Sequence, residues 1–248
     1  AGFLGRAHVA GGAVDWAAFY AGTGAHRVEL PTYPFDRRRF WLDDTGGSAH
    51  PMLDATVEVA ESGGLLLTGR LSRTRTPWLT DHTVGGRVLL PGTAFVELAA
   101  QAAASAGAEG IDQLTLLAPL VLPASGVTQL QVTVGDEDDR GQRTIAIHAR
   151  PAGEVGAAWT RHATGLLGPV APSPDAGANW PPPGAEPLDI GAAYERLADA
   201  GYDYGPAFRG LVAAWSAGSD RYVEVRLPSG VPVDGYGLVK PTTRGFLS

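Results

Sequence analysis

Hydrophobic and polar positions change their pattern several times along the chain, and each change marks a predicted element. Two short apolar runs, at 55–60 and 65–71, flank the turn residues ESGG at 61–64. This arrangement is typical of a β-hairpin. Residues 92–106 instead place apolar side chains at helical spacing, with alanine on all sides, which predicts a helix enclosed by other structure.

The predicted helix has signals at both ends. Pro91 suits the first turn, Thr93 can cap the N-terminus, and Gly107 ends the helix. Strand-like runs follow it at 114–122, 127–134, 143–150 and 159–167. Strands wrapped around one long buried helix predict an α+β unit of the hot-dog type over residues 50–168.

The two flanking regions have a different character. Residues 1–49 hold one short predicted helix, at 14–20, and an extended segment, LPTYPF at 30–35, that suits wrapping over another domain. Residues 169–187 form a linker with seven prolines. Residues 188–248 show a short helix and strand-like runs, and too few residues for a complete second unit.

Composition narrows the function classes. The 248 residues carry 19 basic and 26 acidic side chains, a net charge of -7, which argues against nucleic-acid binding. The sequence shows no apolar stretch long enough to span a membrane, and its lack of cysteine fits a cytoplasmic protein. The lone methionine, Met52, suggests a piece of a longer protein, and the lone lysine, Lys240, marks its own segment as unusual.

His82 is the leading candidate for chemistry. It stands in the spacing H-x3-G-x4-P with Gly86 and Pro91, just before the predicted helix. A base here would face free N–H groups at the helix N-terminus, and Gly86 and Gly92 allow a substrate to approach the backbone. A packed or turn-capping histidine is an equally open interpretation. The other histidines lack ligand spacing, which predicts surface or strand-face positions and no metal site: His8, His26, His50, His148 and His162.

The second candidate motif is YGPAFRG at 204–210. Its Gly205-Pro206 pair forces a turn, Phe208 is expected to be buried, and Tyr204 can direct its hydroxyl into a pocket. A tight turn anchored by aromatic side chains explains the same residues without a function.

Taken together, the two motifs resemble the dehydratase domain of modular type I polyketide synthases. HPML at 50–53 resembles the opening of that domain, and residues 30–41 resemble the linker that follows the acyltransferase. The resemblance extends from residue 1 to about 238. It implies a double hot-dog fold, with the first hot-dog at 50–168 and the second at 188–248.

The resemblance also implies an activity. Such a domain is a hydro-lyase of polyketide (antibiotic) biosynthesis that dehydrates a 3-hydroxyacyl thioester, carried on the phosphopantetheine of an acyl carrier protein, to the 2-enoyl thioester. By this resemblance His82 removes the C2 proton, and Tyr204 lines the pocket with the turn residues Gly205, Pro206 and Phe208. No other cofactor and no metal is implied. The implied partners are the carrier protein, neighbouring domains of a multifunctional enzyme and a second copy in a homodimer.

One part of the family pattern is missing. The family places an Asp in a motif resembling His-Pro-x-x-x-Asp, expected directly after residue 238, where this chain reads VKPTTRGFLS. No acidic residue follows Asp234, and neither Asp203 nor Asp234 matches the family position. We therefore expect a truncated or altered second hot-dog without its central helix, and uncovered apolar sheet surface. The alternative function is a catalytically inactive, dehydratase-like scaffold; a free-standing hot-dog thioesterase or acyl-binding module is disfavoured by the linker.

Overall fold

A computed structural model describes residues 2–26, 50–60, 62–154, 156–170 and 180–237, together with the backbone of 242–247. Contacts divide the chain into two compact units, Ala1–Asp43 and Asp44–Ser248. The first unit holds helices α1 (Gly2–Val9) and α2 (Trp16–Tyr20). The predicted extended segment at 30–35 lies outside the described residues.

The second unit contains a six-stranded antiparallel sheet in the order β1-β2-β6-β7-β8-β5. Side chains along β6 alternate between buried and half-buried, because successive residues of a strand point to opposite faces of the sheet. The apolar runs therefore place one face of the sheet in the core. The strand bounds are Ala55–Glu58, Leu65–Leu71, Thr128–Glu137, Arg143–Pro151, Thr160–Gly168 and Gly110–Leu116.

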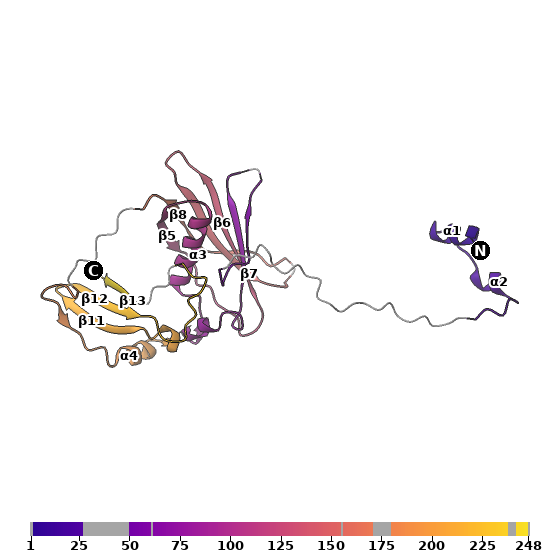
Figure 1. Ribbon diagram of the computed structural model, residues 1–248. Helices are drawn as coiled ribbons and strands as arrows, with labels where there is room; N and C mark the ends of the chain where they lie inside the picture. Colours follow the sequence, from indigo (N-terminus) through magenta and orange to yellow (C-terminus); the bar gives the residue numbers. More distant parts are fainter. Residues whose placement is uncertain are drawn as a thin grey trace. The chain divides into compact units, whose positions relative to one another are not determined.

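Helix α3 (Gly92–Ser105) lies against this sheet and is the predicted central helix (Figure 1). Leu98, Ala99 and Ala102 have no solvent exposure. The small alanine side chains let the sheet approach the helix closely, which explains the alanine-rich composition. Gly107 ends the helical region with a φ of 68°, a conformation that favours glycine.

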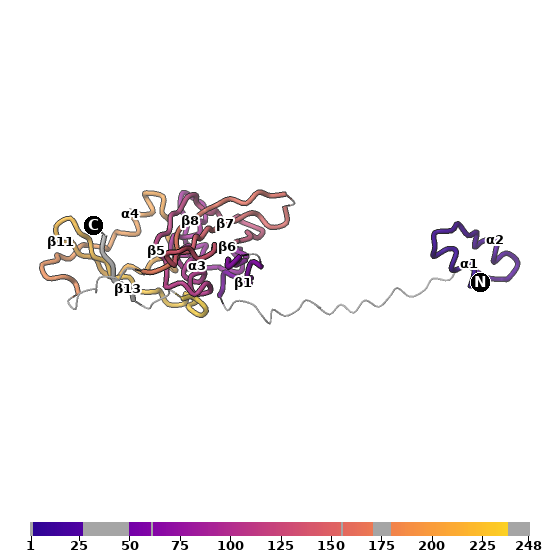
Figure 2. The backbone as a smooth tube through the Cα atoms, turned by 90° about the horizontal axis from the view of Figure 1, so that it is seen from above, coloured from indigo at the N-terminus to yellow at the C-terminus, as the bar shows by residue number. Residues whose placement is uncertain are grey.

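A four-stranded sheet, ordered β13-β12-β11-β9, lies beside the first sheet in Figures 1 and 2. Of the described residues after 180, only α4 (Ala193–Asp199) forms an α-helix, and none of its side chains is buried. Val212 and Val225 on this sheet are 41% and 40% exposed, as expected for a second hot-dog without its central helix. The strands are Thr242–Leu247, Asp220–Arg226, Leu211–Ala217 and Glu186–Pro187.

A third, three-stranded sheet joins the two halves. It has the order β10-β3-β4, built from Tyr202–Tyr204, His82–Val84 and Arg87–Val88. Among the strand pairings of the described residues, only β3 with β10 connects residues 50–168 to residues after 180. The two halves therefore meet at the two motifs singled out in the sequence.

The sequence predicted most elements correctly, and five details were wrong. Phe208 was expected to be buried and is only half-buried. Helix α1 was not expected. The strand predicted at 114–122 begins at Gly110 and ends at Leu116, because the chain then turns to pair Val121 with Leu89 through an isolated bridge. Thr93 does not cap α3, whose N-cap position is Pro91 without a side-chain bond. His50 is not a surface residue, as described below.

Candidate active site

His82 is held at the start of β3 by its own short hairpin. A 3-10 helix, η1 (Pro77–Asp81), ends directly before it. Gly85 and Gly86 turn the chain between β3 and β4 with φ values of 55° and 72°, the geometry of a two-residue hairpin that favours glycine. The turn brings Leu89 back to His82, whose backbone carbonyl accepts the Leu89 N–H at 3.1 Å.

A second bond to Leu89 determines the tautomer of the His82 ring. Nδ1 of His82 lies 3.0 Å from the Leu89 carbonyl oxygen. Because a carbonyl oxygen can only accept, Nδ1 carries the proton and Nε2 holds the free electron pair. Burial of the half-buried ring lowers the pKa of His82, while the bond to Leu89 opposes this shift. Burial therefore favours the neutral ring, with Nε2 unprotonated.

Strand β10 brings the second motif onto His82. Tyr204 is paired directly opposite His82 in the antiparallel ladder, so the two side chains share a face. Their rings are stacked, with centroids 5.3 Å apart and planes 18° apart. Phe208 completes the group, with its ring centroid 5.0 Å from that of His82. Residues more than a hundred positions apart thus form one aromatic cluster.

The remaining predicted residues surround this cluster. Gly86 lies in the β3–β4 turn, Pro91 is the N-cap residue of α3, and Gly92 begins that helix. Gly205 and Pro206 start a second 3-10 helix, η2 (Pro206–Phe208). The backbone N–H of Gly205 donates to the carbonyl of Asp81 at 2.8 Å, beside His82.

A cavity of about 390 Å³ adjoins the cluster, and Phe208 contributes to both. Its wall includes Trp78 and Tyr236, which the sequence did not single out. Nε1 of Trp78 donates to the Tyr236 hydroxyl at 3.0 Å, and the Trp78 and Phe208 rings lie 5.9 Å apart. The cavity is lined mainly by apolar side chains, as small-molecule sites usually are. Its lining also includes Met52, Thr93, Ala94, Val96, Glu97, Ala207, Leu227, Val231 and Pro232.

Glu97 is the charged residue of this cavity wall. It is 5% exposed and its Oε1 accepts a 2.6 Å bond from the backbone N–H of Gly237. The expectation that His50 lies at the surface is wrong, because its ring is 3% exposed and bonded to Glu97 at 3.2 Å. Nδ1 of His50 accepts from the Met52 N–H, so Nε2 donates to Glu97. The one charged residue in the sequence of α3 was the signal that could have identified this pair.

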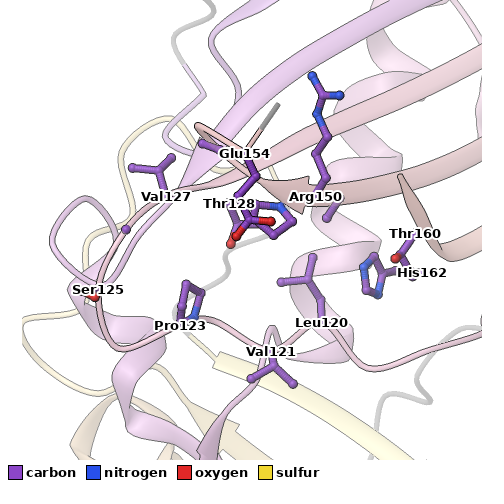
Figure 3. Close-up of a pocket in the computed structure, with 14 residues that line it drawn as sticks. Leu120, Val121, Pro123, Ser125, Val127, Thr128, Arg150, Glu154, Thr160 and His162 are labelled. Atoms are coloured by element: carbon purple, nitrogen blue, oxygen red, sulfur yellow. The ribbon is translucent and has the colours of Figure 1, made fainter. Parts of the chain in front are cut away.

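A second hollow, of about 460 Å³, contains none of the predicted site residues. Figure 3 shows the loop with Pro123 and Ser125 on one side and the strands with Arg150 and His162 on the other. Nδ1 of His162 donates to the Ala118 carbonyl, and the Arg150 guanidinium lies over the Trp159 ring. These contacts account for the polar side chains of the hollow without a ligand. The His82 cluster therefore remains the candidate site.

Two findings bear on metal and membrane. Within the residues that the structure describes, no group of three or more His, Asp or Glu side chains could hold a metal ion. None of the described helices is both long and apolar enough to cross a bilayer.

A sheet around a central helix, extended by a second sheet with a histidine at the junction, defines a domain of the hot-dog class. The polyketide synthase dehydratase domain model matches residues 50–150, and the model described as the polyketide synthase dehydratase N-terminal domain matches residues 172–244. The chain belongs to the polyketide synthase dehydratase domain family.

Curated relatives are much longer than this chain. Polyketide synthase GfsA of Streptomyces halstedii is 48% identical over 240 residues, covering 90% of this chain and 3% of that protein. Mycoketide-CoA synthase of Mycobacterium tuberculosis is 47% identical over 245 residues, covering 94% of this chain and 6% of that protein. The chain thus spans a small part of the length of the curated relatives it matches.

Solved structures agree on the fold. The erythromycin dehydratase has a TM-score of 0.69 at 40% identity, with coverage of 77% of this chain and 70% of that chain. A structure from work on dehydratase substrate selection for the borrelidin and fluvirucin polyketide synthases has a TM-score of 0.72 at 46% identity, with the same coverage. The double hot-dog predicted from the sequence is confirmed.

Proposed function

We propose that this chain removes water from a 3-hydroxyacyl thioester carried on an acyl carrier protein, and leaves the 2-enoyl thioester. The observation that carries the proposal is the His82 tautomer. Its protonated Nδ1 is bound to Leu89, and Nε2 of a neutral ring is left as the base. The apolar cavity beside Phe208 would receive the acyl chain.

In the proposed reaction, Nε2 of His82 takes the C2 proton, the C2=C3 double bond forms, and the C3 hydroxyl leaves as water. The C2 proton is weakly acidic, so the thioester oxygen needs hydrogen-bond donors as charge develops. Backbone N–H groups at the start of α3, next to Gly92, are the expected donors. Tyr204 would line the pocket over the reacting carbons. No cofactor beyond the carrier's phosphopantetheine is required.

The departing hydroxyl also needs a proton, which supports a second candidate function. Among the described residues, no Asp or Glu side chain is in ring contact or hydrogen-bond contact with His82. The imidazolium formed in the first step would then have to return the proton itself. If it cannot, the chain is an inactive dehydratase-like scaffold that contributes contacts to neighbouring domains and to a homodimer.

Turnover separates the two functions. A 3-hydroxyacyl thioester is incubated with the chain, and loss of water is followed by mass spectrometry, with the enoyl thioester and water as the reverse test. His82→Ala should lower the rate on the order of 10²- to 10⁴-fold. His148→Ala is the matched control, because His148 lies on β7 outside the cluster. If the wild-type chain dehydrates and hydrates no faster than His82→Ala, the inactive scaffold is the function instead.

A further inference from the structure

Asp81 makes two bonds to the second motif from the position just before His82. Its carbonyl oxygen accepts the Gly205 N–H at 2.8 Å. Its Oδ2 accepts the Ala207 N–H, also at 2.8 Å. Both donors belong to the turn that follows Tyr204, so one residue connects the strand of the histidine to the turn of the tyrosine.

The carboxylate occupies the place of a missing helix cap. Helix η2 begins after Gly205, which has no side chain to bind the free N–H groups of the first turn. Asp81 supplies the acceptor from another part of the chain. A carboxylate is the strongest acceptor available for this purpose, since hydrogen bonds to charged groups exceed neutral ones.

Gly205 makes this approach possible. A Cβ atom at position 205 would overlap the Cβ, Cγ and Oδ1 atoms of Asp81. The backbone of the turn therefore rests directly on the Asp81 side chain. The glycine of this motif is explained by close contact, because its φ of -78° is open to any residue.

We propose that Asp81 is a positioning residue that holds the Tyr204 ring against His82 by anchoring the turn at Gly205–Ala207. The ladder between β3 and β10 contains only three residue pairs. So short a pairing is marginal without further contacts. The two Asp81 bonds extend it past Tyr204, and they stop the turn from separating from β3. The proposal deepens the proposed function, in which His82 is the base, but the stacking can be measured without turnover.

Nuclear magnetic resonance of the whole chain, with labelled histidine, measures the stacking. The Tyr204 ring shifts the resonances of the His82 ring protons, and Tyr204→Leu gives the unstacked reference. Asp81→Ala should move the His82 resonances to that reference. Asp81→Asn should keep the wild-type values, because its amide oxygen can still accept the Ala207 N–H. Asp203→Ala is the matched control. It removes the same charge from an exposed side chain at the neighbouring ladder position.

Two results would overturn the proposal. Wild-type His82 resonances in Asp81→Ala would show that the ladder alone holds the rings. Equal loss in Asp81→Asn and Asp81→Ala would show that the charge acts instead of the hydrogen bond.

If Asp81→Ala does not fold, hydrogen exchange of the Ala207 amide decides the question. In Asp81→Asn the bond has a neutral acceptor, so exchange at Ala207 should be about tenfold faster, with the Leu89 amide unchanged. Unchanged exchange at Ala207 would contradict the proposal. None of these readouts depends on dehydration, so failure of the proposed function and failure of this inference are distinguishable.

Discussion

The buried Glu97–His50 pair should contribute strongly to stability. Glu97→Leu removes the acceptor of the buried Nε2–H of His50 and of the N–H of exposed Gly237. A buried donor left without a partner costs about 1–3 kcal/mol. We therefore expect the free energy of unfolding to fall by about 2 kcal/mol. At this chain length the melting temperature would drop by roughly 4–8 °C.

Urea unfolding, followed by tryptophan fluorescence, measures the change. Glu97→Gln keeps an oxygen acceptor and should cost about 1 kcal/mol. Glu109→Leu is the control, because Glu109 is exposed and surface substitutions usually change stability by less than about 0.5 kcal/mol. The double variant His50→Leu/Glu97→Leu should lose less than the sum of its single variants, since no donor of His50 is then stranded.

The reasoning would be refuted by a Glu97→Leu variant as stable as Glu109→Leu. The reasoning would also be refuted if the double variant lost the full sum of the two single losses in free energy of unfolding. Such additivity is expected only of residues that do not interact.

Three further predictions follow from other contacts. Leu98→Ala leaves a cavity beside the sheet and should cost about 2–5 kcal/mol in urea unfolding, whereas Val96→Ala, at a position 39% exposed, should cost clearly less. Gly205→Ala should destabilise the chain and weaken the His82–Tyr204 stacking, measured by the same histidine resonances; a stable, fully stacked variant would contradict the close contact with Asp81. Burial lowers the pKa of His82, so the unfolded chain binds its proton more readily; the free energy of unfolding should decrease as the pH falls below about 6.5, and His82→Gln should reduce that slope, with an unchanged slope counting against burial.

The periodic parts of the fold could be predicted from the sequence, because their signals are local. The hairpin of β1 and β2 and the helix after Pro91 follow from spacing and turn residues. The boundary of β5 could not, because the bridge between Val121 and Leu89 is a contact between segments distant in sequence.

The candidate residues of the site could be predicted from the sequence, but the residues that hold them in place could not. His82 and Tyr204 stood out through their motifs, yet the register that stacks them is set by a ladder between two distant strands. Glu97 and Tyr236 carried no motif, and their role depends on burial that appears only when α3 packs. Sequence patterns indicated the candidate residues, whereas tertiary contacts determine which residues hold them in place.

The β3–β10 ladder has a consequence for how such domains can be recombined. Because His82 and Tyr204 are matched pair by pair, their alignment does not depend on the length of chain between β8 and β9. Each doubling of loop length adds only about 0.6 kcal/mol to the cost of closing a loop. Insertions between residues 170 and 180, before Trp180 packs against Trp215, should therefore leave the ladder intact. An exchange between synthases that crosses this connection would join a histidine strand from one parent to a tyrosine strand from another, so the two walls of the cluster would come from different parents.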